Sequence, residues 1–189
     1  MEFNSIYLLR AGQKRGYGIC IPESLSEDWL GISKGKCAPP DVLRFYRDMG
    51  GKKAGDLIGS VQSQVRLISS RMRKILIECG FTGWSAIPCE LAGFESDDEF
   101  YFLVYKGQCG PLKKEMAPIV DVPPPVPGGS WTKSRKGVFF DPGSWDGSDI
   151  FSPEGTWILM VTQRVIDAIA ASKLANVEWK PISEILYTY

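Results

Sequence analysis

The order of apolar and polar positions repeats once along the chain. Residues 65–88, repeat unit 1, align without a gap on residues 158–181, repeat unit 2, with Leu67 on Met160 at an offset of 93. In each unit a short apolar, β-prone run is followed by hydroxyl residues, then by apolar residues at helical spacing, a turn and a second strand-like run. Each unit therefore predicts a strand, a short helix, a turn and a strand.

The middle of each unit predicts a helix with one buried face. In repeat unit 1, Ser69 or Ser70 can cap the helix, and Gly80 can take the left-handed conformation that often ends one. In repeat unit 2, Thr162 stands at the capping position. The expected buried faces are Met72, Ile75, Leu76 and Cys79 in unit 1, and Val165, Ala168, Ile169 and Ser172 in unit 2. Arg71 and Arg164, which align, are expected to form salt bridges or caps on the outside of these helices.

Outside the repeat, three segments have strand patterns and one has a helical pattern. The bulky run at residues 100–105 is the strongest strand signal in the chain, and residues 5–10 and 138–140 give shorter ones. Residues 41–49 follow two prolines and carry apolar residues at helical spacing. We therefore expect a short helix at 41–49.

Residues 118–130, rich in proline and glycine, are the only segment with linker composition. They separate residues 1–117 from residues 131–189, and each part carries one repeat unit. Because the second part is marginal as an independent domain, we predict one domain over residues 1–189, with 118–130 as a surface loop. The predicted class is α+β: a mixed or antiparallel sheet with short helices, built around the two strand-helix-strand units. The units could pair about an internal pseudo-twofold axis, or each could seek a partner subunit, which leaves monomer and homodimer open.

The absence of histidine restricts the chemistry of the chain. Imidazole titrates near pH 7 without perturbation, so Ser-His-Asp and Cys-His nucleophile systems and HExxH zinc sites are excluded in their usual forms. The five cysteines include no CxxC pair, and we expect neither a metal nor a cofactor. Cys109, which lies in a glycine-containing turn, is the cysteine expected at the surface, whereas Cys20, Cys79 and Cys89 are expected to pack among apolar neighbours.

Charge and hydropathy exclude two classes of partner. The 22 basic and 22 acidic residues balance, which removes the electrostatic term of non-specific nucleic-acid binding. The N-terminal segment has no basic region before its short apolar run, and every apolar stretch is far below the ~20 residues that cross a bilayer. We expect a cytoplasmic protein with reduced thiols and with neither nucleic acid nor a membrane as its partner.

The charges are nevertheless segregated along the chain. The first acidic segment, residues 90–99, and the second acidic segment, residues 141–154, contain no Lys or Arg, whereas residues 44–74 are mostly basic. Acidic turns are often merely solvated loops, but exposed aromatic residues beside carboxylates are typical of recognition surfaces. The candidate contact residues for a basic partner are Glu95, Asp97, Asp98 and Glu99 in the first segment, and Asp141, Trp145, Asp146, Asp149, Phe151 and Glu154 in the second.

Two other functions use the same residues. The acids of the second segment could form a carboxylate pair for glycosidic hydrolysis or a site for a hard cation, although their spacing does not match a calcium loop. The chain could also be a scaffold or peptide-binding module. Neither GxGxxG nor GxxxxGK[ST] occurs, so a nucleotide-binding loop is not indicated.

Two groups of motifs resemble a known family. The first is Gly55-Asp-Leu-Ile58 followed by Leu67-Ile-Ser-Ser-Arg71; the second is Gly147-Ser-Asp-Ile-Phe-Ser-Pro-Glu-Gly155, then Val161-Thr-Gln-Arg-Val165 and Val177-Glu-Trp-Lys-Pro181. These motifs, within residues 40–182, resemble the bacterial immunity proteins of polymorphic and contact-dependent toxin systems, in particular a large group first described from myxobacteria. Some relatives carry paired CxxCG motifs, which this chain lacks.

The resemblance implies a non-enzymatic cytoplasmic antitoxin. Such a protein is encoded beside its toxin and binds the toxin tightly, blocking its active site or substrate access. An acidic loop can act as a phosphate mimic in the cleft of a basic, nucleotide-modifying toxin. The expected partner is therefore a cognate toxin, and the acidic segments are its expected contact surface.

Overall fold

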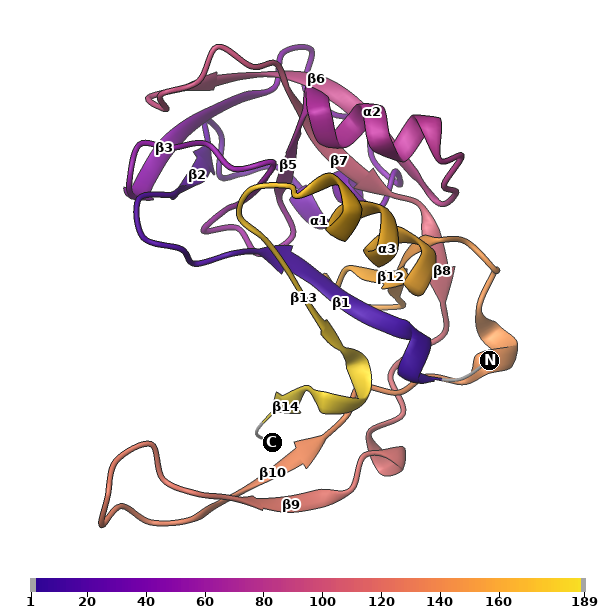
Figure 1. Cartoon of the computed structure of the whole chain (residues 1–189). Coiled ribbons are helices and arrows are strands. Elements are labelled where there is room, and N and C mark those ends of the chain that lie inside the picture. The colour runs from indigo at the N-terminus through magenta and orange to yellow at the C-terminus, as the bar shows by residue number, and fades with distance from the viewer. Residues whose placement is uncertain (1–2, 188–189) are drawn as a thin grey trace.

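The computed structural model describes residues 3–187 (Figure 1). The helices are α1 (Trp29–Ser33), α2 (Ser70–Glu78) and α3 (Gln163–Ser172), with 3-10 turns η1 (Phe3–Ser5), η2 (Lys114–Met116), η3 (Pro142–Ser144) and η4 (Ile182–Glu184). The strands are β1 (Ile6–Ala11), β2 (Gly18–Pro22), β3 (Arg44–Gly50), β4 (Leu57–Gly59), β5 (Arg66–Ser69), β6 (Trp84–Ala92), β7 (Phe100–Tyr105), β8 (Gly107–Cys109), β9 (Ile119–Val122), β10 (Thr132–Lys136), β11 (Ile150–Pro153), β12 (Met160–Thr162), β13 (Val177–Pro181) and β14 (Leu186–Tyr187). The fold is α+β with mixed and antiparallel sheets and short helices, as predicted.

Both repeat units fold as the sequence predicts. Unit 1 forms β5, α2 and β6, and unit 2 forms β12, α3 and β13. Ser69 caps α2 by accepting a hydrogen bond from the Met72 N–H, and Gly80 takes the left-handed conformation beyond its end. Lys173, aligned with Gly80, takes the same conformation after α3. Thr162 stands at the capping position of α3 but makes no capping hydrogen bond with its side chain.

The two large sheets have the same strand order around these units. One runs β13-β1-β12-β11-β8, and the other contains β6-β7-β5-β4. The registers are equivalent, because Leu9 of β1 pairs with Trp179 of β13 where Leu103 of β7 pairs with Ala86 of β6. In each sheet the strand that lies between the two strands of a repeat unit comes from outside that unit. Strand β1 precedes unit 1 but lies between β12 and β13 of unit 2, and β7 precedes unit 2 but lies between β5 and β6 of unit 1. Two copies of one motif have thus exchanged a strand about a pseudo-twofold axis inside one chain.

The central core lies at this pseudo-twofold axis. Helices α2 and α3 contact each other there, and one cluster of buried residues draws on both repeats. Aligned positions contribute in pairs: Met72 with Val165, and Leu76 with Ile169. The predicted helix faces are therefore buried at their central positions, while Cys79 at the end of the α2 face is exposed.

The helix predicted at residues 41–49 is wrong, because most of this segment forms strand β3. It pairs antiparallel with β2 and parallel with β6, and Phe45 is buried against Trp29 and Phe102. Three of the residues whose spacing indicated a buried helix face, Val42, Tyr46 and Met49, are exposed. The backbone partners offered by β2 and β6 outweigh the local periodicity.

The prediction of a loop at residues 118–130 and two predictions about cysteines are also corrected. Residues 118–130 are not one loop: strand β9 occupies their start and pairs with β10, so that this hairpin and β14 form a three-stranded sheet projecting from the body (Figure 1).

Cys109, expected at the surface, is buried in β8, which pairs parallel with β11, and Cys79, expected in the core, is exposed. Burial raises the pKa of the Cys20, Cys89 and Cys109 thiols to about 12, which leaves them unreactive near neutral pH. Among the described helices, none has the length and apolar character required to span a bilayer.

Candidate functional site

The second acidic segment divides into exposed and buried residues. Asp141, Asp146 and Glu154 are exposed, and Trp145 is half-buried. Asp149 is 5% exposed and Phe151 is 0% exposed. Because a contact surface requires accessible side chains, Asp149 and Phe151 are removed from the set of candidate partner contacts.

Asp149 instead joins the two repeats. Its carboxylate accepts hydrogen bonds from the Thr162 hydroxyl at 3.0 Å and the Thr82 N–H at 3.2 Å, and forms an ion pair with Arg164 at 3.1 Å. The sequence alignment of the two units, extended upstream, places Asp56 on Asp149 at the same offset.

Asp56 makes the same three contacts from the other repeat. It accepts from the Ser69 hydroxyl at 2.6 Å and the Ala175 N–H at 2.6 Å, and lies 3.7 Å from Arg71. All of these partners align with the partners of Asp149. Each aspartate thus ties the helix cap of its own repeat to the turn after the helix of the other, which confirms the predicted salt bridges of Arg71 and Arg164 and gives both acids a structural role.

Phe151 belongs to a second core cluster under the acidic segment. Its ring packs edge-to-face on Phe140 at 5.8 Å, and Trp145 covers it at 5.4 Å. The Trp145 indole N–H donates to the Ser148 carbonyl at 3.2 Å. The two aromatic residues that suggested recognition therefore hold the segment on the body, and only part of Trp145 reaches the surface.

Asp146 is exposed but fixed in position. Its carboxylate accepts from the Gln108 N–H at 2.8 Å, the Ser148 N–H at 3.0 Å and the Ser148 hydroxyl at 2.5 Å. Burial pushes the pKa of Asp146 upward, but these hydrogen bonds outweigh it and the pKa lies below its ordinary value. A general acid for glycoside hydrolysis needs the opposite shift.

This depressed pKa predicts acid sensitivity. A carboxylate with a lowered folded-state pKa contributes stability that is fully present above its ordinary value of 3.8 and is lost as the pH falls through the folded-state pKa. We expect Asp146→Asn to flatten the dependence of the free energy of unfolding on pH below about 4. Urea titrations of the wild type and the variant between pH 2 and pH 7 measure it, and parallel curves over that range would contradict it.

The end of the second acidic segment carries an accessible carboxylate beside an accessible aromatic side chain. Residues 154–157, which we call the acidic tip, comprise a turn at 154–155 and the two residues after it; Glu154 is exposed and Trp157 is 50% exposed. Its backbone is held from below by two buried cations: Lys34 donates to the Pro153 carbonyl at 2.8 Å, and Arg66 donates to the Trp157 carbonyl at 3.1 Å. Burial lowers the pKa of both groups. Neither has a carboxylate in salt-bridge contact within the described chain. Lys34 thus holds the carbonyl just before the tip, and Arg66, whose guanidinium also lies over the Tyr105 ring, holds the carbonyl at its end.

Trp157 was missed in the sequence because it begins an apolar run that reads as strand. The strand starts only at Met160, which leaves Trp157 in the irregular segment between the turn and the strand. Gly155, two residues upstream, has a positive φ of 69° and marks that turn. A turn-forming glycine close before a tryptophan was the available signal.

The first acidic segment comprises the end of β6 and the connection to β7, and most of its acids already have partners. Glu95 pairs with Lys52 at 3.7 Å, Asp98 accepts from the Ser70 hydroxyl at 2.5 Å, and Glu99 accepts from the Tyr101 hydroxyl at 2.7 Å. Asp97 is exposed, and its carboxylate has no hydrogen bond or ion pair within residues 3–187. Asp98 and Glu99 line an open groove of about 370 Å³ whose apolar walls are Pro88, Leu91, Phe100 and Tyr101.

The fold keeps the two acidic segments apart. The Glu99 carbonyl accepts from the Ser70 N–H at the start of α2, whereas Asp149 contacts Thr82 beyond the end of that helix. The segments therefore lie at opposite ends of β6, a strand of nine residues spanning about 27 Å. They do not form one continuous acidic surface.

The described part of the chain contains no convergence of three or more Cys, Asp or Glu side chains that could hold a metal ion. A scan against models of known protein families and a search of curated proteins both gave no match.

Proposed function

We propose that the chain is an immunity protein that binds a cognate bacterial toxin and neutralises it by blocking its active site or substrate access, in the cytoplasm and without catalysis. The motifs of the two repeats support this function, since they resemble those of immunity proteins. The acidic tip is the observation that carries it: Glu154 and Trp157 are presented to solvent on a backbone anchored by buried side chains. Asp141 and Asp146 add carboxylates to the same segment.

A tip of this kind suits inhibition by occupation. Rigid presentation reduces the entropy that binding must overcome, because the turn is already ordered before the partner arrives. Exposed carboxylates accelerate association with a basic partner, and a tryptophan is among the residues that contribute most to binding energy at interfaces. The tip therefore fits a basic cleft with an apolar pocket.

The test is binding to the protein encoded next to this chain in its source genome. We expect the two to co-purify after co-expression, and the variant Glu154→Lys/Trp157→Ala to raise the Kd by about 30-fold or more, as removal of a central hot spot does. Isothermal titration calorimetry measures it.

A matched control is Asp48→Lys, which reverses a charge on exposed β3 and should leave the Kd within about twofold. Circular dichroism verifies that both variants fold. An unchanged Kd for the tip variant would place the interface elsewhere. Absence of any complex with the wild type would overturn the proposed function.

A further inference from the structure

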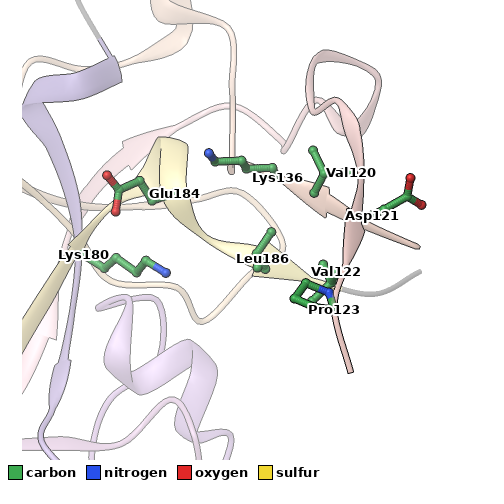
Figure 2. Close-up of a pocket in the computed structure, with 8 residues that line it drawn as sticks. All are labelled: Val120, Asp121, Val122, Pro123, Lys136, Lys180, Glu184 and Leu186. Atoms are coloured by element: carbon green, nitrogen blue, oxygen red, sulfur yellow. The ribbon is translucent and has the colours of Figure 1, made fainter. Parts of the chain in front are cut away.

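A groove lies between the projecting sheet and the body of the molecule (Figure 2). Its volume is about 420 Å³. The register pairs Val120 with Ser134 and Lys136 with Leu186, so alternation along the strands places Val120, Val122, Lys136 and Leu186 on one face of the sheet. Lys180 of β13 and Glu184 of η4 line the groove from the body. We call this space the arm groove.

The arm groove combines an apolar floor with unpaired cations. Val120, Val122, Pro123 and Leu186 form the floor. The ammonium groups of Lys136 and Lys180 have no ion pair or side-chain hydrogen bond within residues 3–187. Asp121 also lies at the groove, but it pairs across the strands with Lys133 on the other face of the sheet, and Figure 2 shows its carboxylate pointing away from the two lysines.

Another antiparallel strand pair of this chain, β2 and β3, is covered by a helix. Between β2 and β3, α1 buries Trp29 and Ile32 against Phe45. Between β9 and β10, by contrast, Val126 is 62% exposed and Trp131 is 65% exposed. A projecting sheet with this much accessible apolar surface and no helix over it is typical of a binding surface.

We propose that the arm groove binds an extended segment of the partner protein in which apolar side chains alternate with carboxylates. The apolar side chains pack on Val120, Val122 and Leu186, and a carboxylate lies between Lys136 and Lys180. Charge selects this occupant, because the carboxylate of Asp121 points away and two lysines then face the groove against the carboxylate of Glu184. The inference rests on the proposed function, since it gives the same partner a second contact of opposite charge to the acidic tip.

The groove chemistry can be tested with defined peptides on the full chain. The probes are acetyl-Val-Glu-Val-Glu-Val-amide and its Lys-for-Glu counterpart, added at millimolar concentration to ¹⁵N-labelled protein. We expect the glutamate peptide to shift the amide signals of Val120, Val122 and Leu186, and the lysine peptide to leave them unmoved. The double variant Lys136→Glu/Lys180→Glu should weaken the glutamate peptide at least tenfold, whereas Lys133→Glu, on the opposite face of β10, should bind it as the wild type does.

Three results would overturn the proposal. The first is that neither peptide shifts the groove signals, and the second is that both shift them equally. The third is that the groove signals change with the concentration of the chain itself and the chain sediments as a dimer, which would make a second copy the occupant.

Titration with the co-expressed partner separates this inference from the proposed function. We expect Lys136→Glu/Lys180→Glu to raise the Kd for the partner at least tenfold. If the partner binds this variant as tightly as the wild type, the arm groove is not its site and the proposed function stands. If the partner does not bind the wild type, both proposals fail.

Discussion

Replacing Asp149 with alanine is expected to lower the free energy of unfolding by about 3 kcal/mol, a large fraction of the stability of an ordinary domain. The carboxylate is buried and is the acceptor for the Thr162 hydroxyl and the Thr82 N–H as well as the partner of Arg164. Its removal leaves a partly buried donor from each repeat without its acceptor, which costs more than the loss of an exposed ion pair. Urea unfolding followed by tryptophan fluorescence measures the change.

Because the two repeats are equivalent, the same experiment can be made on the equivalent aspartate of the other repeat. Asp56→Ala removes the equivalent contacts with Ser69, Ala175 and Arg71 and should destabilise by a similar amount. Asp141→Ala removes only an exposed cap on η3 and should cost about 0.5 kcal/mol. If Asp149→Ala proved as mild as Asp141→Ala, these aspartates would not be what joins the repeats.

The two repeat units could be predicted from sequence because their signals are local. A hydroxyl cap at Ser69, a helical spacing of apolar residues and a left-handed glycine at Gly80 all act within a dozen residues, and each appears in the structure. The exchange of β1 and β7 could not be predicted, since short strands give no local signal of their neighbours. The equivalence of Asp56 and Asp149 was nevertheless readable, because the same offset extends upstream of the aligned region.

Segments whose structure depends on distant partners were predicted poorly. Residues 41–49 have helical spacing, yet β2 and β6 complete the hydrogen bonds of a strand there. The prolines of residues 118–130 indicated a loop, and all but Pro118 do follow β9. They did not indicate that β9 would pair with β10 in a projecting sheet. In both places the tertiary partner decides the conformation rather than the local pattern.

In the second acidic segment, the exposure of individual residues was predicted incorrectly. Carboxylates among aromatic residues indicated exposure of both, whereas Asp149 and Phe151 are buried. All four residues of β11 are buried, so the strand lacks the alternation of apolar and polar residues that would show which side chains face the core. The exposed aromatic group is Trp157, three residues beyond Glu154.

Truncation of these two aromatic residues should therefore have opposite consequences. Phe151→Ala is expected to lower the free energy of unfolding by about 4 kcal/mol, because it leaves a cavity between Phe140 and Trp145 in a fully buried site. Trp157→Ala, at a half-exposed position whose backbone bond to Arg66 is retained, should change it by less than about 1 kcal/mol.

Binding measurements complete the contrast between the two variants. Under conditions where both are folded, Trp157→Ala is expected to weaken the complex with the co-expressed partner by about 10-fold or more, since a tryptophan at an interface is a frequent hot spot. Phe151→Ala should bind nearly as tightly as the wild type at low temperature, because its side chain lies beneath the surface. A tightly binding Trp157→Ala variant alongside a weakly binding, fully folded Phe151→Ala variant would reverse the assignment and mean that the acidic segment opens to expose its core when it meets its partner.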